Sequence, residues 1–239
     1  MKTLLLKFSG PLQSWGTSSH FETRETDRYP SKSAVIGMVA ASLGYRRHED
    51  KKIQELNDLD FGVRIDQAGE SLRDYHIARK YKNNGDIERT YVTDRYYLED
   101  AIFIVAIGHE DEQFVEKIEQ GLKEPYFQPF MGRRSLPLSA DFFIESSKKD
   151  VVESLQQLPW QAAKWYKKTS TNQLTAYVDS DLVLGEPTQM RQDRAKSFSQ
   201  KNRSFGFRGE AQIKIEIQDK KLDKKGFLNE HDAFDALGG

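Results

Sequence analysis

The stretch TLLLKFSGPLQSWG (residues 3–16) opens the chain with an apolar run that stops at a loop bracketed by glycines. The run over residues 2–8 predicts a buried strand. The loop after it is long and polar, and it carries Gln13, Ser14 and Trp15 between its two glycines. Glycine lets a backbone come close to a ligand. This loop is therefore the first candidate binding element.

Outward from this strand, strand and helix patterns follow in the order of a ferredoxin-like unit. Ser31 or Ser33 is a plausible N-cap for the next helix, and Gly44 is a plausible stop. The later strand 101–109 is almost continuously apolar, as in the centre of a sheet. The predicted elements are a helix over 31–44, a short polar helix over 48–58, strands over 60–66 and 101–109, a helix over 111–122, and a last strand near 126–131 or 141–145. We expect an α+β, RRM-like βαββαβ domain over residues 1–145.

A hairpin is predicted between the two middle strands of this unit. Asn83, Asn84 and Gly85 form a turn signal inside the segment 72–98, whose flanks are extended and too polar for a core. Basic residues alternate there with aromatic ones, which suits contact with a nucleic-acid backbone and its bases. We expect a protruding arm. The alternative is an edge hairpin whose tyrosines pack on the domain body.

Residues 146–239 are expected to form a smaller, β-rich part. The patterns predict a helix over 150–158, two short strands within 173–185 and an alternating strand over 211–218. The acidic end, 229–239, is either a frayed tail or a short docking helix.

Composition limits the class of protein. The 239 residues are 37% hydrophobic and 31% charged, as in a soluble globular protein. No apolar stretch approaches the roughly 18 residues of a membrane span, so no membrane partner is expected. The chain has no cysteine, which excludes disulfides, thiolate metal sites and a cysteine nucleophile. Without a signal-peptide pattern, a cytoplasmic location is expected.

Charge is segregated along a chain whose net charge is −1. Residues 98–124 hold eight acidic residues against two lysines, and residues 186–209 hold six basic residues against two acidic ones. Such a chain can bind a polyanion at one face and a partner at another. The alternative is a set of solvated charges without a role.

Catalytic patterns are missing from the sequence. The five histidines are scattered, and no HExxH, Gly-x-Ser-x-Gly or Walker-type loop is present. We expect neither a metal nor a cofactor. A metal-independent ribonuclease needs only an acid, a base and a cation. The side chains that could supply them are His20, Tyr29, Lys32, Tyr45 and His76, but no spacing joins them into a unit.

Three further segments suit anions. Ser31, Lys32 and Ser33 stand at a predicted helix start, where free N–H groups attract phosphate. Arg133 and Arg134 follow a glycine, and two guanidiniums can fork onto phosphates or bases. The segment 191–209 adds arginines and phenylalanines. On a βαββαβ core these segments favour single-stranded RNA over duplex DNA.

Four motifs together resemble a known family. They resemble the CasD family, CRISPR-associated RAMP-type subunits of type I-E Cascade, and they are LLKFSGPLQSWG (5–16), RYPSKSAVIGMVAASLG (28–44), LRDYH (72–76) and PFMGRRSLPLS (129–139). Their order and spacing match over about residues 2–145, and the C-terminal part matches loosely.

The resemblance implies a non-catalytic subunit with a protruding thumb that binds and caps the 5′ handle of crRNA in antiviral defence. It implies contacts with the backbone subunit CasC and the large subunit CasA. The residues it points to are Gln13, Ser14, Trp15, Lys32, Ser33, Arg73, Tyr75, His76, Arg133, Arg134 and Ser135; Arg191 lies in a segment that matches only in general character.

Two other functions stay open from the sequence. One is a crRNA-processing endoribonuclease, and the other is a protein scaffold whose basic patches contact only acidic groups of partners. Within the loop 10–16, Gln13 and Ser14 offer hydrogen-bond donors. For Trp15 we favour an anchor in the core over a stacking face.

Overall fold

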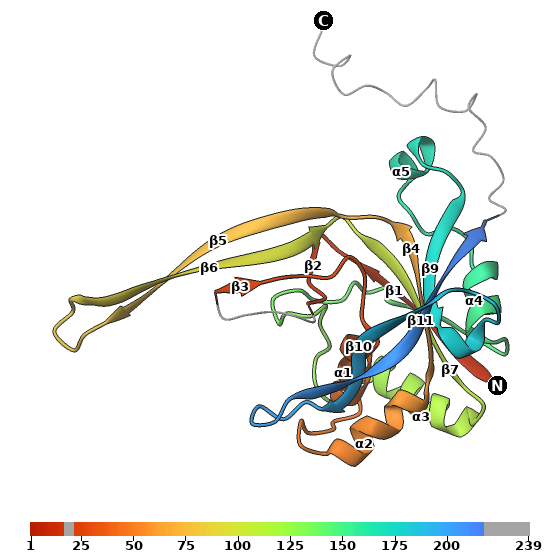
Figure 1. Cartoon of the computed structure of the whole chain (residues 1–239), viewed down its shortest axis with the longest axis horizontal. Coiled ribbons are helices and arrows are strands. Elements are labelled where there is room, and N and C mark those ends of the chain that lie inside the picture. Colours follow the sequence, from red (N-terminus) through yellow and green to blue (C-terminus); the bar gives the residue numbers. More distant parts are fainter. Residues whose placement is uncertain (17–21, 218–239) are drawn as a thin grey trace, which may run out of the picture.

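The computed structural model describes residues 1–16 and 22–217. Its centre is a seven-stranded sheet with the order β10-β11-β9-β4-β7-β1-β8, in which every neighbouring pair is antiparallel (Figure 1). The strands are β1 (Lys2–Ser9), β4 (Asp60–Gln67), β7 (Ile102–His109), β8 (Phe143–Ser147), β9 (Gln173–Asp179), β10 (Thr188–Ser197) and β11 (Ser204–Glu216). The mixed α+β class is confirmed.

Helices cover both faces of the sheet. The helices are α1 (Lys32–Ser42), α2 (Asp50–Glu55), α3 (Glu112–Lys123), α4 (Val151–Gln157) and α5 (Lys164–Thr169), with 3-10 turns η1 (Leu56–Asp58) and η2 (Ser180–Leu182). Side chains of β1 alternate between two buried clusters: Leu4 and Leu6 pack with α1, α2 and α3, whereas Leu5 packs with α4. A strand buried on both faces explains why Leu4, Leu5 and Leu6 follow one another without a polar alternation.

The predicted helix at 31–44 forms as α1. Ser31 is its N-cap, because the Ser31 side chain accepts a hydrogen bond from the backbone N–H of Ala34. Gly44 follows the helix with φ +77°, a backbone conformation that glycine adopts without strain. Val35, Met38 and Val39 are buried, as their spacing predicted.

The segment 72–98 forms a hairpin that projects far from the sheet (Figure 1). It consists of β5 (Glu70–Tyr81) and β6 (Ile87–Glu99), and Gly85 stands in its turn with φ +89°. Every residue from Arg73 to Tyr81 is exposed, so the packed alternative is wrong for this strand. Near the root, β6 also pairs with two short strands, β2 (Leu12–Gln13) and β3 (Thr23–Arg24).

Several predictions for the second half need correction. Of the two places expected for the last strand of the βαββαβ order, the structure has the one near 141–145, as β8. The region 173–185 has one strand followed by η2 where two strands were expected. The basic segment 186–209 is largely β10 and β11, and α5 has no counterpart in the prediction. The tail 229–239, with His231, and His20 lie outside the described residues.

The C-terminal strands extend the sheet past β4. β9 pairs with β4 through Gly62 to Ile65, and β11 then pairs with β9. Elements from both sides of residue 145 therefore share one sheet, and the predicted domain boundary there stays a prediction.

Candidate nucleic-acid interface

The projecting hairpin has two chemically different faces. Successive side chains of a strand point to opposite faces of a sheet. The register places His76 opposite Thr93 and Ala78 opposite Tyr91 on one face. On the other face, Ile77 stands opposite Val92. We call the first the basic face and the second the apolar face.

The basic face contains a shallow hollow near the root of the hairpin. Its lining comes from β3, β5 and β6 and consists of Arg24, His76, Ala78, Tyr91, Thr93 and Arg95. Arg89 lies further out, with its guanidinium carbon 4.8 Å from the centre of the Tyr91 ring. Asp74 is the acidic neighbour, opposite Arg95. Guanidiniums beside aromatic rings suit a phosphate backbone and a stacked base.

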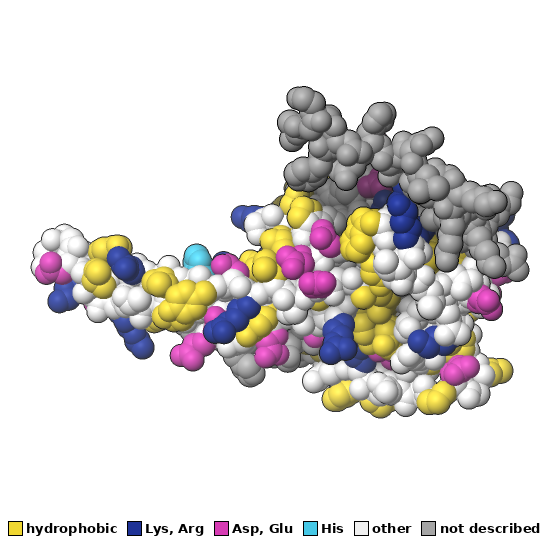
Figure 2. Space-filling view, turned by 90° about the horizontal axis from the view of Figure 1, so that it is seen from above, with side chains coloured by type: hydrophobic (Ala, Val, Ile, Leu, Met, Phe, Trp, Pro, Cys, Tyr) yellow, Lys and Arg dark blue, Asp and Glu magenta, His cyan; other side chains and the backbone are white. Residues whose placement is uncertain are grey.

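The apolar face presents large hydrophobic side chains to solvent. Their exposed fractions run from 44% for Val92 to 58% for Tyr75. Hydrophobic side chains follow the length of the hairpin in Figure 2. The members of this face are Tyr75, Ile77, Tyr81, Ile87 and Val92. Exposed apolar rows of this kind mark protein contact sites.

The LRDYH motif is split between these two faces. His76 lines the hollow. Arg73 and Tyr75 lie on the apolar face, where Arg73 donates two hydrogen bonds of 3.0 Å to the carboxylate of Asp94. The pKa of Arg73 is raised by its hydrogen bonds and ion pair with Asp94. Of the three predicted residues, the structure brings only His76 to the basic face.

The loop 131–135 packs directly on the loop 10–16. The backbone N–H of Ser14 donates to the carbonyl of Met131 at 3.2 Å. Gly132 has φ +83°, and a Cβ at this position would lie 1.6 Å from the carbonyl oxygen of Ser14. Only glycine permits this contact. Two motifs separated by more than a hundred residues therefore form one structural unit.

The two arginines of this loop have different surroundings. Arg133 donates through Nη2 to the carbonyls of Arg24 at 3.0 Å and Tyr96 at 3.1 Å, and its guanidinium lies 4.1 Å from the centre of the Tyr97 ring. Arg133 thus ties the loop to the root of the hairpin. Arg134 and Ser135 are exposed, so they are the residues of this motif that a ligand can reach.

The side chains of Gln13 and Trp15 anchor the loop 10–16 to the core. Both amide hydrogens of Gln13 are used, by the carbonyls of Phe8 at 3.2 Å and Ala101 at 2.7 Å. Trp15 donates from its indole to Gln13 Oε1 at 3.0 Å and stacks on Phe8. Gln13, Ser14 and Trp15 are at most 5% exposed. The assignment of these three side chains to RNA contact stays a prediction, and the burial of Trp15 against Phe8 agrees with the anchor role favoured for it.

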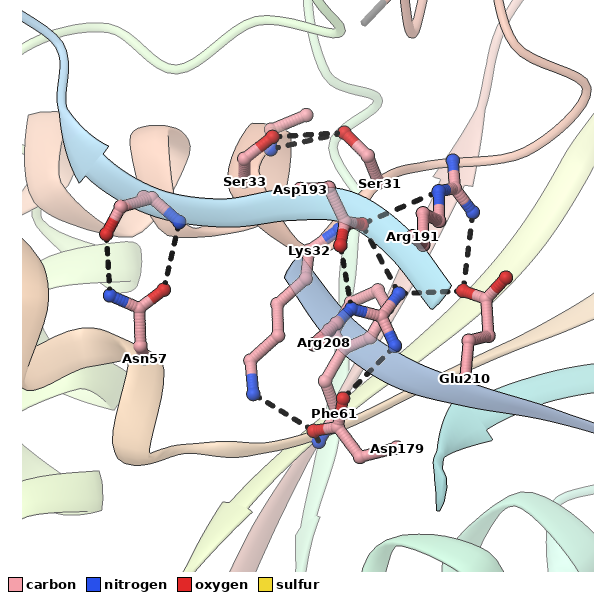
Figure 3. A network of polar contacts seen from close by, with 12 residues as sticks. Ser31, Lys32, Ser33, Asn57, Phe61, Asp179, Arg191, Asp193, Arg208 and Glu210 are labelled. Atoms are coloured by element: carbon pink, nitrogen blue, oxygen red, sulfur yellow. Dashed lines mark hydrogen bonds and ion pairs between the residues drawn. The ribbon is translucent and has the colours of Figure 1, made fainter. Parts of the chain in front are cut away.

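The predicted phosphate site at the start of α1 is filled by the chain itself (Figure 3). The backbone N–H of Lys32 donates to Asp193 Oδ2 at 2.9 Å, and the Lys32 ammonium donates to Asp179 at 2.8 Å. Lys32 is 6% exposed. A carboxylate thus occupies the place where a helix start favours an anion. The assignment of Lys32 to RNA stays a prediction, and in this structure its ammonium is already paired with Asp179.

Arg191 belongs to the same buried ion cluster (Figure 3). It pairs with Asp27 at 2.9 Å, with Asp193 at 3.4 Å and with Glu210 at 3.2 Å. Its assignment to RNA likewise stays a prediction, and in this structure three carboxylates of the same chain already pair with its guanidinium.

Arg208 completes this cluster. It pairs with Asp193 at 2.7 Å, Asp179 at 3.0 Å and Glu210 at 2.6 Å. Burial alone would lower the pKa of Arg208, but these carboxylates raise it above its usual range. The basic stretch 186–209 is therefore partly an interior feature that holds β10 and β11 to β9 and α1.

A small hollow beside this cluster retains cationic character. It lies between the end of the loop 10–16, the start of α1 and the β10–β11 hairpin. Its lining includes Ser31, Ser33, Gln192 and Arg203. Burial and the nearby Arg47 lower the pKa of Arg203. Of the residues predicted at the helix start, Ser31 and Ser33 line this hollow, whereas Lys32 does not.

The residues considered for a ribonuclease have separate partners. The Tyr29 hydroxyl donates to Glu210 at 2.8 Å, and burial raises the pKa of Tyr29. The Tyr45 hydroxyl accepts from Lys117 at 3.0 Å, and Lys32 pairs with Asp179. His76 lies out on the hairpin.

The described residues contain neither a metal-binding cluster nor a membrane-crossing helix. Within 1–16 and 22–217, no group of three or more His, Asp or Glu side chains is placed to hold a metal ion. In the same ranges no helix has the length and apolar character to cross a bilayer.

Sequence reasoning did not single out Arg24, which lines the hollow of the basic face. Its strand has two residues and pairs in parallel with β6. A two-residue strand leaves no periodic signal, so no pattern in the sequence points to this arginine.

Comparisons with known proteins agree on one family. The model of the family described as CRISPR-associated protein (Cas_Cas5) matches residues 3–209. The chain is 33% identical over 155 residues to the CRISPR system Cascade subunit CasD of Escherichia coli (strain K12), over 59% of this chain and 69% of that protein.

Solved structures give a similar result. A chain of a CRISPR RNA-guided surveillance complex aligns with a TM-score of 0.75 and 29% identity over 90% of each chain. A crystal structure of a Cas protein aligns with a TM-score of 0.65 and 30% identity, over 90% of this chain and 95% of the other.

Proposed function

The chain belongs to the Cas5 family of CRISPR-associated proteins, and on that premise we propose that it is a Cascade subunit that binds and caps the 5′ handle of crRNA. The observation that carries this proposal is the basic face of the hairpin. Its hollow joins Arg24, His76 and Arg95 to the ring of Tyr91. This combination serves phosphates and bases of a single strand.

Arg134 and Ser135 extend this surface. The neighbouring Arg133 holds the backbone of Arg24, so the exposed part of the loop 131–135 stands next to the hollow. A guanidinium there has the geometry for a bidentate contact with a phosphate. We assign Arg24, His76, Arg95 and Arg134 to the RNA contact.

The apolar face is assigned to protein. A subunit that caps one end of a filament must hold its neighbour as well as the RNA. Tyr75, Ile77 and Val92 offer the aromatic and aliphatic surface that protein interfaces bury. We assign this face to the backbone subunit CasC, and we place the large subunit CasA elsewhere on the body.

A ferredoxin-like core is part of the same proposal. The strand order β8-β1-β7-β4, with α1 and α3 in the two crossovers, is the arrangement we assign to that fold. β9, β10 and β11 then form an extension of the sheet. The ion cluster around Arg208 joins this extension to α1.

We assign the subunit a non-catalytic role. A ribonuclease of this type must bring an acid, a base and a cation within hydrogen-bond reach of one phosphate. Tyr29 and Lys32 are engaged with Glu210 and Asp179, and His76 lies on the hairpin. These separate positions support capping of an RNA that another protein has cut.

The RNA contact is tested by titrating the purified chain with labelled crRNA of its host's own repeat. Arg24→Ala with Arg95→Ala should weaken binding by at least tenfold, since a hydrogen bond to a charged group contributes about 1.5–3 kcal/mol. The matched control is Arg79→Ala, an exposed arginine on the opposite face of the same hairpin. Equal affinities for the double variant and the control would refute the assignment.

The same purified chain and labelled RNA distinguish the proposed function from the two alternatives, a protein scaffold and a ribonuclease. A protein scaffold without RNA contacts would show no steep dependence of affinity on salt, which phosphate contacts always produce. Site-specific cleavage of repeat RNA in EDTA would instead show that the chain is a ribonuclease.

The protein contact is tested by removing the outer hairpin, which carries Tyr81 and Ile87 of the apolar face. Deleting residues 79–91 and closing the strands with a short turn should leave a soluble core, because every residue from 79 to 90 is exposed. We expect this variant to fail to join the complex with CasC. Normal assembly, measured by co-purification, would contradict the assignment.

A further inference from the structure

The hairpin continues β4 and β7, two neighbouring strands of the central sheet. The ladder of the sheet ends at the pair Gln67 and Ile102, and the ladder of the hairpin begins at the pair Glu70 and Glu99. Where the hairpin leaves the sheet, both strands change direction (Figure 1). We call the segments that make this change, 67–69 and 99–101, the joint.

The joint has unusual backbone geometry on both strands. Asp100 has φ +55°, and it is the one non-glycine residue with a positive φ among residues 1–16 and 22–217. On the other strand, a Cβ at Gly69 would lie 2.6 Å from the carbonyl oxygen of Glu99. A backbone in a sparsely populated conformation persists only where its surroundings hold it. The direction of the hairpin therefore depends on what holds the joint.

Gln67 holds Asp100 in this conformation. Gln67 donates from Nε2 to the carbonyl of Asp100 at 2.6 Å, and its Oε1 accepts from the backbone N–H of Ala163 at 3.1 Å. The backbone N–H of Asp100 donates to the carbonyl of Pro11 at 3.2 Å. Gln67 is 3% exposed, so its hydrogen bonds form out of contact with water. Both backbone polar groups of Asp100 are thus fixed by the body of the protein.

Two further side chains hold the rest of the joint. Gln13 donates to the carbonyl of Ala101 at 2.7 Å, and the backbone N–H of Ala68 donates to Tyr166 Oη at 3.3 Å. Gln13 comes from β2 and Tyr166 from α5. Together with Gln67 of β4, three separate elements hold the joint. This arrangement gives a physical reason for two buried glutamines at the root of the hairpin.

We propose that the joint fixes the direction of the hairpin and that Gln67 is a positioning residue for the RNA contact of the basic face. The proposal rests on the function proposed above, because that contact combines His76 on the hairpin with Arg134 on the body. His76 lies six residues from Glu70 on β5, roughly 20 Å along the strand. A tilt of about 10° at the joint would move His76 by about 3.5 Å, which exceeds the length of a hydrogen bond.

The first measurement follows the direction of the hairpin without RNA. The chain has no cysteine, so nitroxide labels can be attached to Arg79→Cys on β5 and Gln120→Cys on α3, two exposed positions. Double electron–electron resonance gives the distribution of distances between the labels. Gln67→Met keeps the length of the side chain and loses both hydrogen bonds, so it should broaden this distribution or shift its centre. An unchanged distribution would overturn the proposal.

The matched control is Asn57→Leu. Asn57 is also a buried amide, 7% exposed, and it donates to the carbonyl and accepts from the backbone N–H of Ala195 on β10. This variant loses an equivalent pair of hydrogen bonds away from the joint. It should lower the melting temperature and leave the distance distribution unchanged. Equal broadening in Gln67→Met and Asn57→Leu would refute a role that is specific to the joint.

Asp100 gives a second test at an exposed position. Glycine adopts a positive φ without strain, whereas a β-branched residue is strongly disfavoured there. Asp100→Gly should keep the centre of the distance distribution, and Asp100→Val should move it. The same distribution in both variants would show that the conformation of Asp100 does not set the direction of the hairpin.

The last measurement is the affinity for crRNA, which separates the joint from the proposed function. Kd rises in inverse proportion to the fraction of chains in the binding-competent direction, so a fraction of about one tenth gives about tenfold weaker binding. Gln67→Met should therefore bind crRNA more weakly than Asn57→Leu. Unchanged affinity in Gln67→Met, while Arg24→Ala with Arg95→Ala loses affinity, would refute the positioning role. Unchanged affinity in all of these variants would instead refute the RNA contact itself, and the distances alone would then support the joint.

Discussion

Gly132→Ala tests whether the contact between the loops 10–16 and 131–135 holds the candidate interface together. A Cβ on residue 132 would lie 1.6 Å from the carbonyl oxygen of Ser14, and φ at this position is +83°. A residue with a side chain in this left-handed conformation costs roughly 1–2 kcal/mol. The displaced backbone adds about 1–3 kcal/mol, as in other overpacked sites.

The backbone of Ser14 cannot move away without a cost in free energy, because its neighbours Gln13 and Trp15 are buried and hydrogen-bonded. We therefore expect Gly132→Ala to lower the free energy of unfolding by about 2–5 kcal/mol. It should also displace Arg134 and weaken RNA binding. Urea unfolding followed by circular dichroism measures the first effect, and crRNA titration measures the second.

The control is Gly85→Ala in the hairpin turn. Gly85 has a similar φ of +89°, but a Cβ there would meet nothing within 4 Å. Only the conformational cost of about 1–2 kcal/mol should appear in this variant. Gly132→Ala and Gly85→Ala with the same unfolding free energy would refute the argument that the contact with Ser14 is what requires glycine.

Further predictions concern the arginines, the ion cluster and alkaline pH. Arg133→Ala should lower thermal stability, because Arg133 donates to two backbone carbonyls, whereas Arg134→Ala should leave the melting temperature unchanged and weaken crRNA binding. Asp193→Asn should cost about 3–5 kcal/mol in urea unfolding, because Arg208 would stay buried with an incomplete set of partners. Burial raises the pKa of Tyr29 above its ordinary value of 10.0, so the native state keeps this proton where the unfolded chain loses it. Stability should fall as pH rises past about 10, and less steeply in Tyr29→Phe.

Much of the fold could be predicted from the sequence, because the caps and turns that delimit its elements depend on residues close together in the chain. The Ser31 cap, the Gly44 stop and the Asn83–Gly85 turn each depend on residues a few positions apart. The apolar runs at 2–8 and 101–109 likewise indicate burial from composition alone. The α+β class and the order of the first elements followed from these signals.

The second half was harder, because its strands depend on distant pairing. β10 and β11 are polar in sequence, yet their inward side chains form a charged layer that is neutralised internally. A hydrophobic pattern does not detect a strand of this kind. For this reason the sequence pattern alone indicated that the basic residues of β10 and β11 bind an external anion.

From the residues alone, most strands, helices and turns of the first half could be predicted, together with the cations and aromatics that the proposed RNA contact needs. Which of these cations a ligand can reach depends on the folded arrangement. Lys32 and Arg191 form ion pairs with carboxylates that are far away in the sequence. Arg133 donates hydrogen bonds to backbone carbonyls, whereas Arg134 is exposed. The physical reason is that the availability of a charge depends on its partners in space, and these are fixed by strand pairing over long separations and not by neighbours in the chain.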